Sequence, residues 1–441
     1  MSDDIHLFLN NIDRYKLFMK KKILLILAAV VLLTVIVICV LRWNVWFHNA
    51  PEPSYTVSSK IAHIQLSLGD DFNDRFVSWQ SIVLDSAKVN LDDYGVIWMP
   101  ISDSVVMNNN NNNNNNAIAA VATVIDSEFE SDTSALDNSI FVKANYRYIQ
   151  SAGGEACYFY TKANLSPGRW KYSIVAGDTM SCWYETEIPD VDSVSILIIA
   201  DVQDKQYSGT DTLLNSMFNR HKIDAVLQLG DLVERPHQQY WERYFQDFRA
   251  ITPTVPMLSV PGNHDYIKGV NKHIDERFFC VFPSYLHDDS IPEYAVMQLK
   301  IGNTSFFIMD TNEPLSTLYK QKKWLLDSDD NSDDSAENII ILMHHPMKSA
   351  ISQFRDIRMK LCMGNVFNDI NADLVMAAHE HTVDIKEIDE DIPQIITNFS
   401  AKNYEEDNGG RYYTLLLIEN GKVRAEVYDE KHVLRHTFSL Q

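Results

Sequence analysis

Five apolar runs between residues 195 and 379 are each followed at once by side chains that can bind a metal ion or transfer a proton. These side chains are Asp201 and Gln203 (ADVQ), Asp231 (LGD), Asn263 and His264 (PGNHD), His344 and His345 (MHHP), and His379 and His381 (AHEH). Imidazole nitrogens and carboxylate or carboxamide oxygens are ligands of hard and borderline divalent metals. One four-coordinate ion would leave several of them unused, whereas two ions bridged by a carboxylate would use them.

Two metal ions about 3.5–4 Å apart can hold a phosphoryl group, generate hydroxide from water near neutral pH and stabilise the leaving oxygen. Asn263 would supply a neutral oxygen to one of the two ions. His264 would then remain to donate to the phosphate or to protonate the leaving alcohol. Each motif alone is common in turns and helix caps, but all five in this order predict a dinuclear metal site suited to phosphate esters.

The elements that would position these residues alternate along the chain. Strand-like apolar runs cover residues 195–201, 225–231, 252–260, 305–312, 339–346 and 373–379. Helix-like segments cover residues 213–221, 238–250 and 318–327. This alternation predicts an α/β domain over residues 193–441. Ligands of such a sheet bind at the carboxyl ends of its strands, where the polar side chains are expected to converge.

Residues 58–190 follow a different pattern of short runs rich in β-branched and aromatic residues, separated by turn residues. The runs are IAHIQLSL, RFVSWQSI, AIAAVATVI, SIFVKANYRYI, EACYFYTKA, GRWKYSIVA and CWYETEIP. Several short strands at this spacing predict an all-β sandwich. The run of asparagines at 108–116 is of low complexity and is expected to be an exposed loop of the sandwich.

The series DxQ, GDLVE, GNHD, MHHP and HEH resembles the motif pattern of the metallophosphoesterase (calcineurin-like) superfamily over residues 193–400. The resemblance implies a four-layer α/β/β/α sandwich with a dinuclear metal centre. It assigns Asp201, Gln203 and His381 to the first metal, Asp231 to the bridge between the metals, Asn263, His344 and His379 to the second metal, and His264 to stabilisation of the transition state. His345 would orient a neighbouring ligand or contact the substrate, and the sequence leaves both roles open.

The preceding region is similar to the fibronectin-III-like domain of purple acid phosphatases, chiefly in the stretch ANLSPGRWKYSIVAGD. Three positions depart from the patterns of these families. Gln203 stands where most of the superfamily has His, Glu234 stands where purple acid phosphatases have an iron-binding Tyr, and Ala378 replaces a Gly. A pair of Mn, Fe(II) or Zn ions is therefore expected in place of a tyrosinate–iron(III) centre.

Residues 23–41 form an uncharged apolar run, close to the roughly 20 residues that cross a bilayer as a helix. Lysines at 20–22 precede it, so the positive-inside bias predicts a cytoplasmic segment at 1–22, a transmembrane anchor at 23–42 and an outward-facing remainder. Residues 43–57 are expected to be a short linker. A cleaved signal peptide is the alternative to the anchor, although its apolar core would be about 7–15 residues long.

The formal net charge of −22 disfavours binding to a nucleic-acid backbone, which depends on Lys and Arg. Of the five cysteines, Cys157 and Cys182 are candidates for a disulfide outside the cytoplasm; the alternative is four buried thiols beyond the anchor.

The expected function is a membrane-anchored phosphoesterase that hydrolyses phosphate esters by attack of a metal-bound hydroxide. The sequence leaves monoesters and diesters, such as nucleotide diesters, open as substrates. A surface binding protein with an inactive catalytic domain is the alternative from another class of protein. The oligomeric state has no signature in the sequence.

Overall fold

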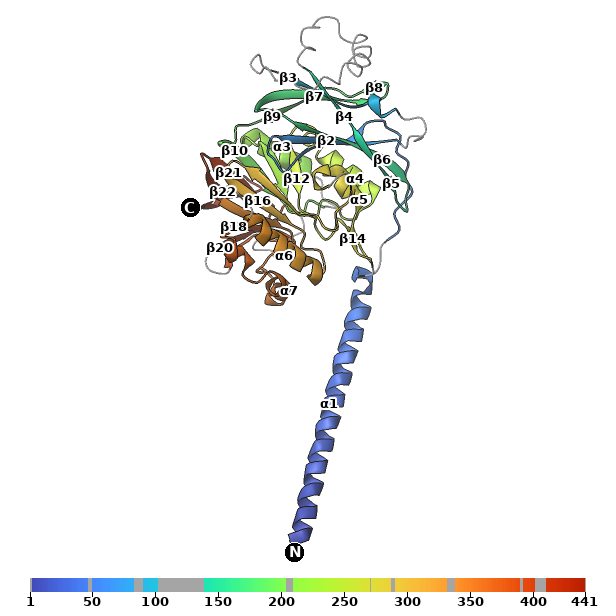
Figure 1. Ribbon diagram of the computed structural model, residues 1–441, viewed down its shortest axis with the longest axis vertical. Coiled ribbons are helices and arrows are strands. Elements are labelled where there is room, and N and C mark those ends of the chain that lie inside the picture. The colour runs from blue at the N-terminus through green and yellow to red at the C-terminus, as the bar shows by residue number, and fades with distance from the viewer. Residues whose placement is uncertain are drawn as a thin grey trace, which may run out of the picture. The chain divides into compact units, whose positions relative to one another are not determined.

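The computed structural model describes residues 2–46, 50–82, 90–101, 139–203, 209–269, 271–286, 290–330, 338–388, 392–400 and 410–440 (Figure 1). The asparagine run and the predicted strand 117–125 lie outside these residues. The chain forms two units. One unit holds Met1–Ala50 with Lys268–His273, and the other holds Pro51–Ile267 with Ile274–Gln441.

The first unit consists mainly of helix α1 (Ser2–Trp46). Its section Phe18–Trp43, 26 residues long, is apolar enough to cross a membrane. A signal-anchor and a signal sequence both have these properties, so the orientation of the chain stays a prediction.

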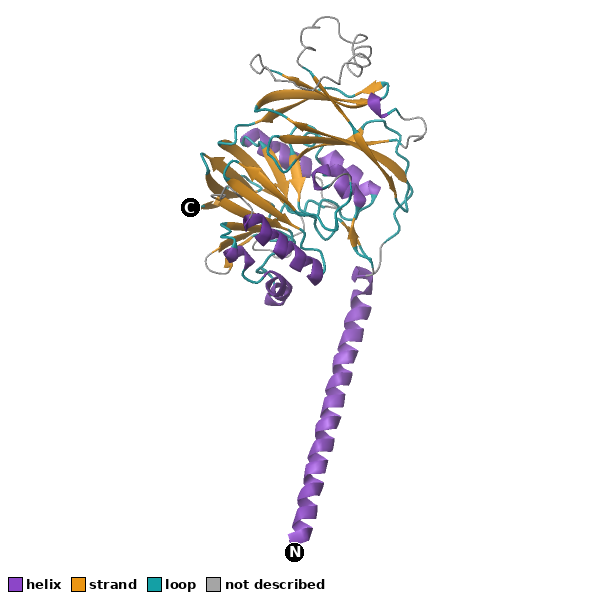
Figure 2. Cartoon of the chain, viewed as in Figure 1, coloured by secondary structure: helices purple, strands orange, loops and turns teal. Residues whose placement is uncertain are grey.

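The described residues of the second unit form three main sheets, which Figure 2 shows as strands with helices against them. The ten-stranded sheet has the order β23 (Leu434–Ser439), β22 (Lys422–Asp429), β21 (Tyr412–Glu419), β10 (Ser193–Ile199), β11 (Ala225–Gln228), β12 (Met257–Ser259), β1 (Ala62–Leu68), β2 (Asp74–Ser81), β6 (Glu155–Asn164) and β5 (Asn145–Gln150). The six-stranded sheet has the order β15 (Met297–Ile301), β16 (Thr304–Met309), β17 (Asn338–Met343), β18 (Leu374–Ala377), β20 (Ile392–Ile396) and β19 (Asp384–Ile388).

The third sheet has the order β4 (Ile140–Lys143), β3 (Tyr94–Pro100), β7 (Gly168–Ala176) and β8 (Thr179–Met180), with β9 (Tyr184–Ile188) also paired to β7. Strands β13 (Tyr266–Ile267) and β14 (His273–Ile274) form a small ribbon. Among its described residues, the second unit has the helices α3 (Thr210–Arg220), α4 (Gln238–Asp247), α5 (Glu276–Val281), α6 (Leu315–Asp330), α7 (Gln353–Met363) and α8 (Val366–Asp369), with 3-10 turns η1 (Leu91–Asp93) and η3 (Pro283–Tyr285). The predicted α/β alternation is confirmed.

Parallel strands bring the predicted motifs to common edges. In the first sheet, Ile199 of β10 pairs with Gln228 of β11, and Gln228 pairs with Ser259 of β12. The second sheet repeats this arrangement, because β16, β17 and β18 are also parallel to one another. The polar residues that follow these strands therefore leave each sheet at one edge.

Alternate residues of the six-stranded sheet face two different hydrophobic cores. Phe306 and Ile308 of β16 belong to a core that also contains β10, β11 and helices α3 and α4. Phe307 and Met309 belong to another core, formed with helices α6, α7 and α8. The period of two along a strand therefore packs one sheet against its neighbour and against the helices on its other face.

The N-terminal region shares a sheet with the α/β region. Strand β1 pairs in parallel with β12, with Ser67 opposite Met257, so the ten-stranded sheet continues into β2, β6 and β5. A separate aromatic core, which includes Trp79, Trp98 and Trp170, lies within the N-terminal sheets. The domain boundary predicted between residues 190 and 193 stays a prediction.

The cysteines are free thiols. Cys182 is exposed, whereas Cys157, Cys280 and Cys362 are buried, so the structure has neither the Cys157–Cys182 disulfide nor four buried thiols beyond the anchor.

Tyr172 gives a direct test of how the N-terminal sheets are joined to the α/β region. It is fully buried on β7, and its hydroxyl donates to the carbonyl of Pro253, just before β12, at 2.6 Å. Tyr172→Phe should lower the free energy of unfolding by about 1–3 kcal/mol, because the buried carbonyl loses its donor. Denaturant unfolding measures this loss. Tyr146→Phe, at an exposed position on β5, is the control, and equal stability of both variants would contradict the role of the bond.

Candidate metal centre

The candidate ligands occupy unusual backbone conformations. Asp201, Asp231, His379 and His381 have φ angles of 54°, 57°, 73° and 51°. They are four of the eight residues other than glycine with positive φ in the described part of the chain. Such conformations are uncommon, and they concentrate at functional sites where the surrounding structure imposes them. At these four residues the backbone leaves the extended conformation of the preceding strand.

Asp231 lies at the centre of the cluster and is 1% exposed. Its Oδ1 accepts the backbone N–H of His264 at 2.8 Å and lies 3.4 Å from Nε2 of His344. Its Oδ2 accepts a hydrogen bond from Nε2 of Gln203 at 2.9 Å. Both carboxylate oxygens therefore face other candidate residues.

Asp201 and the remaining candidates extend the cluster. Oδ1 of Asp201 lies 3.6 Å from Nε2 of His381, and its Oδ2 accepts the backbone N–H of His379 at 3.2 Å. Nε2 of His344 lies 3.1 Å from Oδ1 of Asn263 and 3.3 Å from Nδ1 of His379. All the residues assigned to a metal from the sequence thus belong to one connected group.

The donor set fits a bound metal. Asp201, Asp231 and His344 each offer one ligand atom, and these atoms lie within 4.8 Å of one another. Nε2 of His344 faces acceptors on Asp231, Asn263 and His379, and a single ring N–H cannot donate to three atoms. Oε1 of Gln203 is buried and has no hydrogen-bond partner among the described residues. Convergent oxygens and nitrogens of this kind suit divalent cations.

The electrostatics of the cluster call for positive charge. Burial alone would lower the pKa of His344, but the carboxylates of Asp231 and Asp201 and the carbonyl of Leu229 together raise it to about 9. Burial likewise opposes ionisation of Asp231, whereas the charges of His344 and His264 hold the pKa of this carboxyl well below its usual range. Asp231 is therefore buried as an anion that an imidazolium or a metal cation must balance.

The chain is similar to known proteins in sequence and in fold. Residues 194–383 match the family model of the calcineurin-like phosphoesterases. The solved structure of a purple acid phosphatase from yellow lupin covers 86% of this chain, and the match covers 74% of that chain, with a TM-score of 0.58 and 13% identity.

The chain also shares 34% identity over 83 residues with the metallophosphoesterase 1 homolog of Drosophila melanogaster. This match spans 17% of the chain and only 22% of the relative's length. A Plasmodium protein described as GAP50, the anchor in the inner membrane complex, aligns with 12% identity over 56% of this chain and 89% of its own, with a TM-score of 0.40.

Residues 194–383 thus belong to the calcineurin-like metallophosphoesterase superfamily.

Two glycines allow the metallophosphoesterase loops to approach each other. A Cβ atom on Gly262 would lie 2.0 Å from the backbone nitrogen of Asp231 and 2.2 Å from its Oδ1. A Cβ atom on Gly230, which has φ of 91°, would lie 2.7 Å from Nδ1 of His344. No other residue fits at either position without moving a candidate ligand.

Asp265 is a functional residue that the sequence reading did not single out. Its carboxylate accepts the backbone N–H groups of Gly262, Asp231 and Leu232 at 2.7, 3.0 and 3.0 Å. Burial, together with the nearby Asp231 charge, raises the pKa of Asp265 to about 7. Asp265 therefore ties the loop of Asn263 to the loop of Asp231. It stands in the GNHD motif, but only the three-dimensional structure shows which backbone groups it holds.

His264 and His345 differ in how they are held. The Nδ1 atom of His264 lies 2.8 Å from the carbonyl oxygen of Glu234, so this nitrogen carries the hydrogen and Nε2 is left for a ligand. His345 contacts the hydroxyl of Thr311 through its backbone N–H and through Nδ1, both at 3.0 Å. Its ring lies 4.2 Å from the ring of His379, which is compatible with either role predicted for His345.

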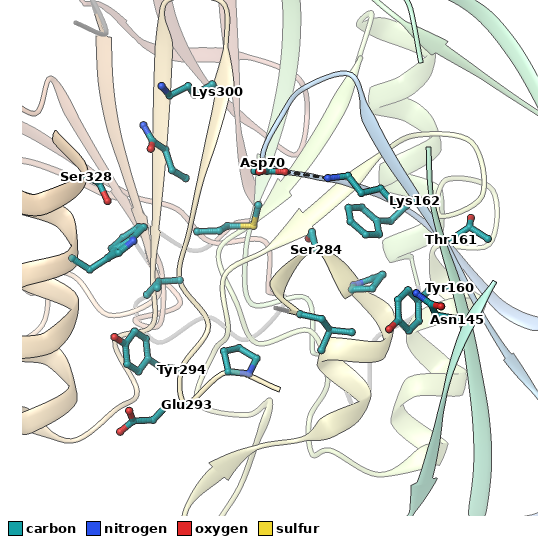
Figure 3. A pocket seen from close by; sticks show the side chains of 18 of the residues that line it. Asp70, Asn145, Tyr160, Thr161, Lys162, Ser284, Glu293, Tyr294, Lys300 and Ser328 are labelled. Carbon is teal, nitrogen blue, oxygen red and sulfur yellow. Dashed lines mark ion pairs between the residues drawn. The ribbon is translucent and has the colours of Figure 1, made fainter. Parts of the chain in front are cut away.

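A cavity of about 1260 Å³ lies elsewhere in the same unit (Figure 3). Its lining includes Tyr160 and Lys162 of β6, Tyr294, Lys300 of β15 and Trp324 of α6, and no candidate ligand. Lys162 forms an ion pair with Asp70 there, at 3.5 Å. The chemistry of the metallophosphoesterase site therefore does not extend to this cavity.

Gly262 provides a test of the metal centre itself. Gly262→Ala should displace Asp231 and weaken binding of Mn(II) or Zn(II) by at least about 10-fold, the size of effect seen when support of a ligand is lost. Calorimetric titration of the metal-free chain measures the affinity. Gly410→Ala is the control, because the nearest atom to a Cβ there lies at 3.5 Å. Unchanged affinity in Gly262→Ala would contradict the arrangement.

Proposed function

We propose that the chain is a membrane-anchored, purple acid phosphatase-like enzyme that hydrolyses phosphate esters with two divalent metal ions. The observation that carries this proposal is the convergence of Asp201, Asp231 and His344, all buried, at the strand ends of a metallophosphoesterase domain. Helix α1 would hold the catalytic domain outside the cytoplasm, with residues 1–22 inside. The proposed architecture is a four-layer α/β/β/α sandwich after a fibronectin-III-like sandwich.

The proposed ligand sets follow the cluster. Asp201, Gln203 and His381 would hold one ion, Asn263, His344 and His379 would hold the other, and Asp231 would bridge them. Bound divalent ions would supply charge for the phosphoryl oxygens and would lower the pKa of a water molecule. Glu234 cannot serve as a tyrosinate ligand, which supports Mn, Fe(II) or Zn as the metal pair.

His264 would act on the leaving group. Because its Nδ1–H points to the carbonyl of Glu234, its Nε2 is the nitrogen that can carry a proton toward a substrate. A water molecule that has given one proton to solvent adds to phosphorus as the bond to the ester oxygen breaks. That oxygen takes the proton from Nε2 of His264, and the ring regains a proton from solvent. A hydrogen bond to the backbone fixes the ring without competing for this nitrogen. His345 is proposed to orient His379 or to contact the phosphate.

Loss of the bridging carboxylate tests the proposal. The chain should hydrolyse 4-nitrophenyl phosphate or its bis ester, should lose this activity on chelation and should regain it with Mn(II), Fe(II) or Zn(II). Asp231→Asn should lower kcat at least about 100-fold, as expected when a group that stabilises the transition-state charge is removed. The ratio of the two substrates distinguishes a monoesterase from a diesterase.

Asp224→Asn is the matched control, because Asp224 is a buried carboxylate paired with Lys222 at 3.0 Å and belongs to no candidate ligand set. No turnover by the folded parent chain with any of the metals would favour the binding protein with an inactive catalytic domain.

Gln203 tests the ligand assignment at the position that departs from the family. Gln203→His should bind Zn(II) more tightly than the parent chain, since imidazole is a stronger ligand for zinc than a neutral amide oxygen. Gln203→Ala should bind Zn(II) more weakly. Competition with a chromogenic chelator measures both affinities. If neither substitution changes the affinity, Gln203 does not contact the metal.

A further inference from the structure

The segment that follows helix α1 along the chain forms the first residues of the second unit, from Pro51 on. The backbone N–H of Tyr55 donates to the carbonyl of Gly153 at 3.0 Å. A Cβ atom on Gly153 would lie 2.6 Å from the carbonyl oxygen of Pro53, and one on Gly154 would lie 2.5 Å from that of Tyr55. The C-terminal part of the predicted linker 43–57 is thus held in place by backbone contacts.

Glu52, in this segment, has a buried carboxylate. Its side chain is 6% exposed and forms an ion pair with Arg277, which is 2% exposed, at 2.6 Å. The same oxygen accepts the backbone N–H of Gln238, the first residue of α4, at 2.6 Å. A carboxylate at a helix N-terminus is favoured by the helix dipole. Burial opposes ionisation, but the hydrogen bonds from Arg277, Ser151 and the backbone of Gln238, together with the charge of Arg277, lower the pKa of Glu52.

Arg277 connects Glu52 to two loops of the proposed catalytic site, the loop from Asp231 to His237 and the loop that carries Asn263. Its guanidinium donates to the carbonyl of Pro236, two residues after Glu234, whose own carbonyl faces His264. It also donates to the carboxylate of Asp275 at 2.9 and 3.0 Å.

The backbone N–H of Asp275 in turn donates to the carbonyl of Asp265 at 3.2 Å. Through its own carboxylate, Asp265 holds the backbone of Asp231. The guanidinium is thus linked directly to the loop that holds His264, and through Asp275 to the loop that carries Asn263.

We propose that Glu52 is a positioning residue of the phosphoesterase, acting through Arg277 to hold the loop that orients His264. The segment between the apolar helix and the catalytic domain is then part of the support of the site. This inference rests on the proposed function, because it assigns a catalytic task to His264.

The physical reason is the burial of Arg277. Without Glu52, the guanidinium keeps Asp275 but loses its second carboxylate, and a buried charge with incomplete pairing is strongly unfavourable. Arg277 would turn toward water, and the carbonyl of Pro236 would lose its donor. The loop from Asp231 to His237 would then be free to shift. Small displacements of a catalytic group lower the rate by about 10- to 100-fold.

The leaving group of the substrate reports the position of His264. In the full-length chain, Glu52→Ala should lower kcat for phenyl phosphate by about 10- to 100-fold, because this poor leaving group needs a proton. The loss should be much smaller for 4-nitrophenyl phosphate, which leaves readily as the anion. Glu52→Gln should give a smaller loss than Glu52→Ala, since its carbonyl still accepts from Arg277 and Gln238 although the charge is gone.

Asp74→Asn is the matched control. The Asp74 side chain is also 6% exposed and pairs with Lys162 of β6 at 2.7 Å. Removing its charge should leave the ratio of the two substrates at the parental value. If Glu52→Ala does not fold, Arg277→Lys replaces it, because lysine keeps the charge but cannot reach Glu52, Asp275 and Pro236 together.

Amide hydrogen exchange of the metal-free chain gives a readout that needs no turnover. Glu52→Ala, or Arg277→Lys in its place, should speed exchange at the amides of residues 231–237, and Asp74→Asn should not; the amide of Gln238 is left out because Glu52 itself is its acceptor. If the Glu52→Ala or Arg277→Lys variant exchanges its amides at the rate of the parent chain and keeps the parental ratio of the two substrates, the positioning role is wrong. If the parent chain hydrolyses neither substrate, the proposed function fails, and the exchange result alone decides whether Glu52 holds the loop.

Discussion

The burial of the Asp201 and Asp231 carboxyl groups is the constraint to which the rest of the site responds. Both carboxylates are almost completely removed from solvent, at 0% and 1% exposure. An anion in such surroundings is stable only if cations or hydrogen-bond donors face it. His344 and His381 lie beside these two carboxylates, and backbone N–H groups of His264 and His379 point at them. The same convergence that balances the charge creates a place where divalent metal ions would be held.

The fold meets this constraint through its strand ends. Parallel strands in two sheets stop at common edges, and the residue after several of them takes a left-handed conformation that turns its side chain inward. Gly230 and Gly262 let two of these turns pass at van der Waals distance. Asp265 then fastens the two turns together through backbone hydrogen bonds. The left-handed residues, the two glycines and the Asp265 hydrogen bonds are all local features, but they form one site only because the sheets place the turns beside one another.

The sequence predicts the elements whose signals are local and misses those that depend on distant partners. The candidate ligands could be predicted from the sequence because they follow apolar strands. Strand β3 was not predicted, although its residues Tyr94–Pro100 are almost all buried. The pairing of Glu52 with Arg277 joins residues 225 positions apart, and no spacing rule connects them. Asp265 lies in a recognised motif, yet its partners are backbone groups, which leave no trace in residue types.

The central claim is that the cluster around Asp231 binds two metal ions. Anomalous X-ray scattering from crystals of the chain grown with Mn(II) tests it most directly. The account predicts two peaks about 3.5–4 Å apart, with the Asp231 carboxylate between them, Asp201 beside one peak and His344 beside the other. A single peak, or manganese bound only away from these residues, would contradict it.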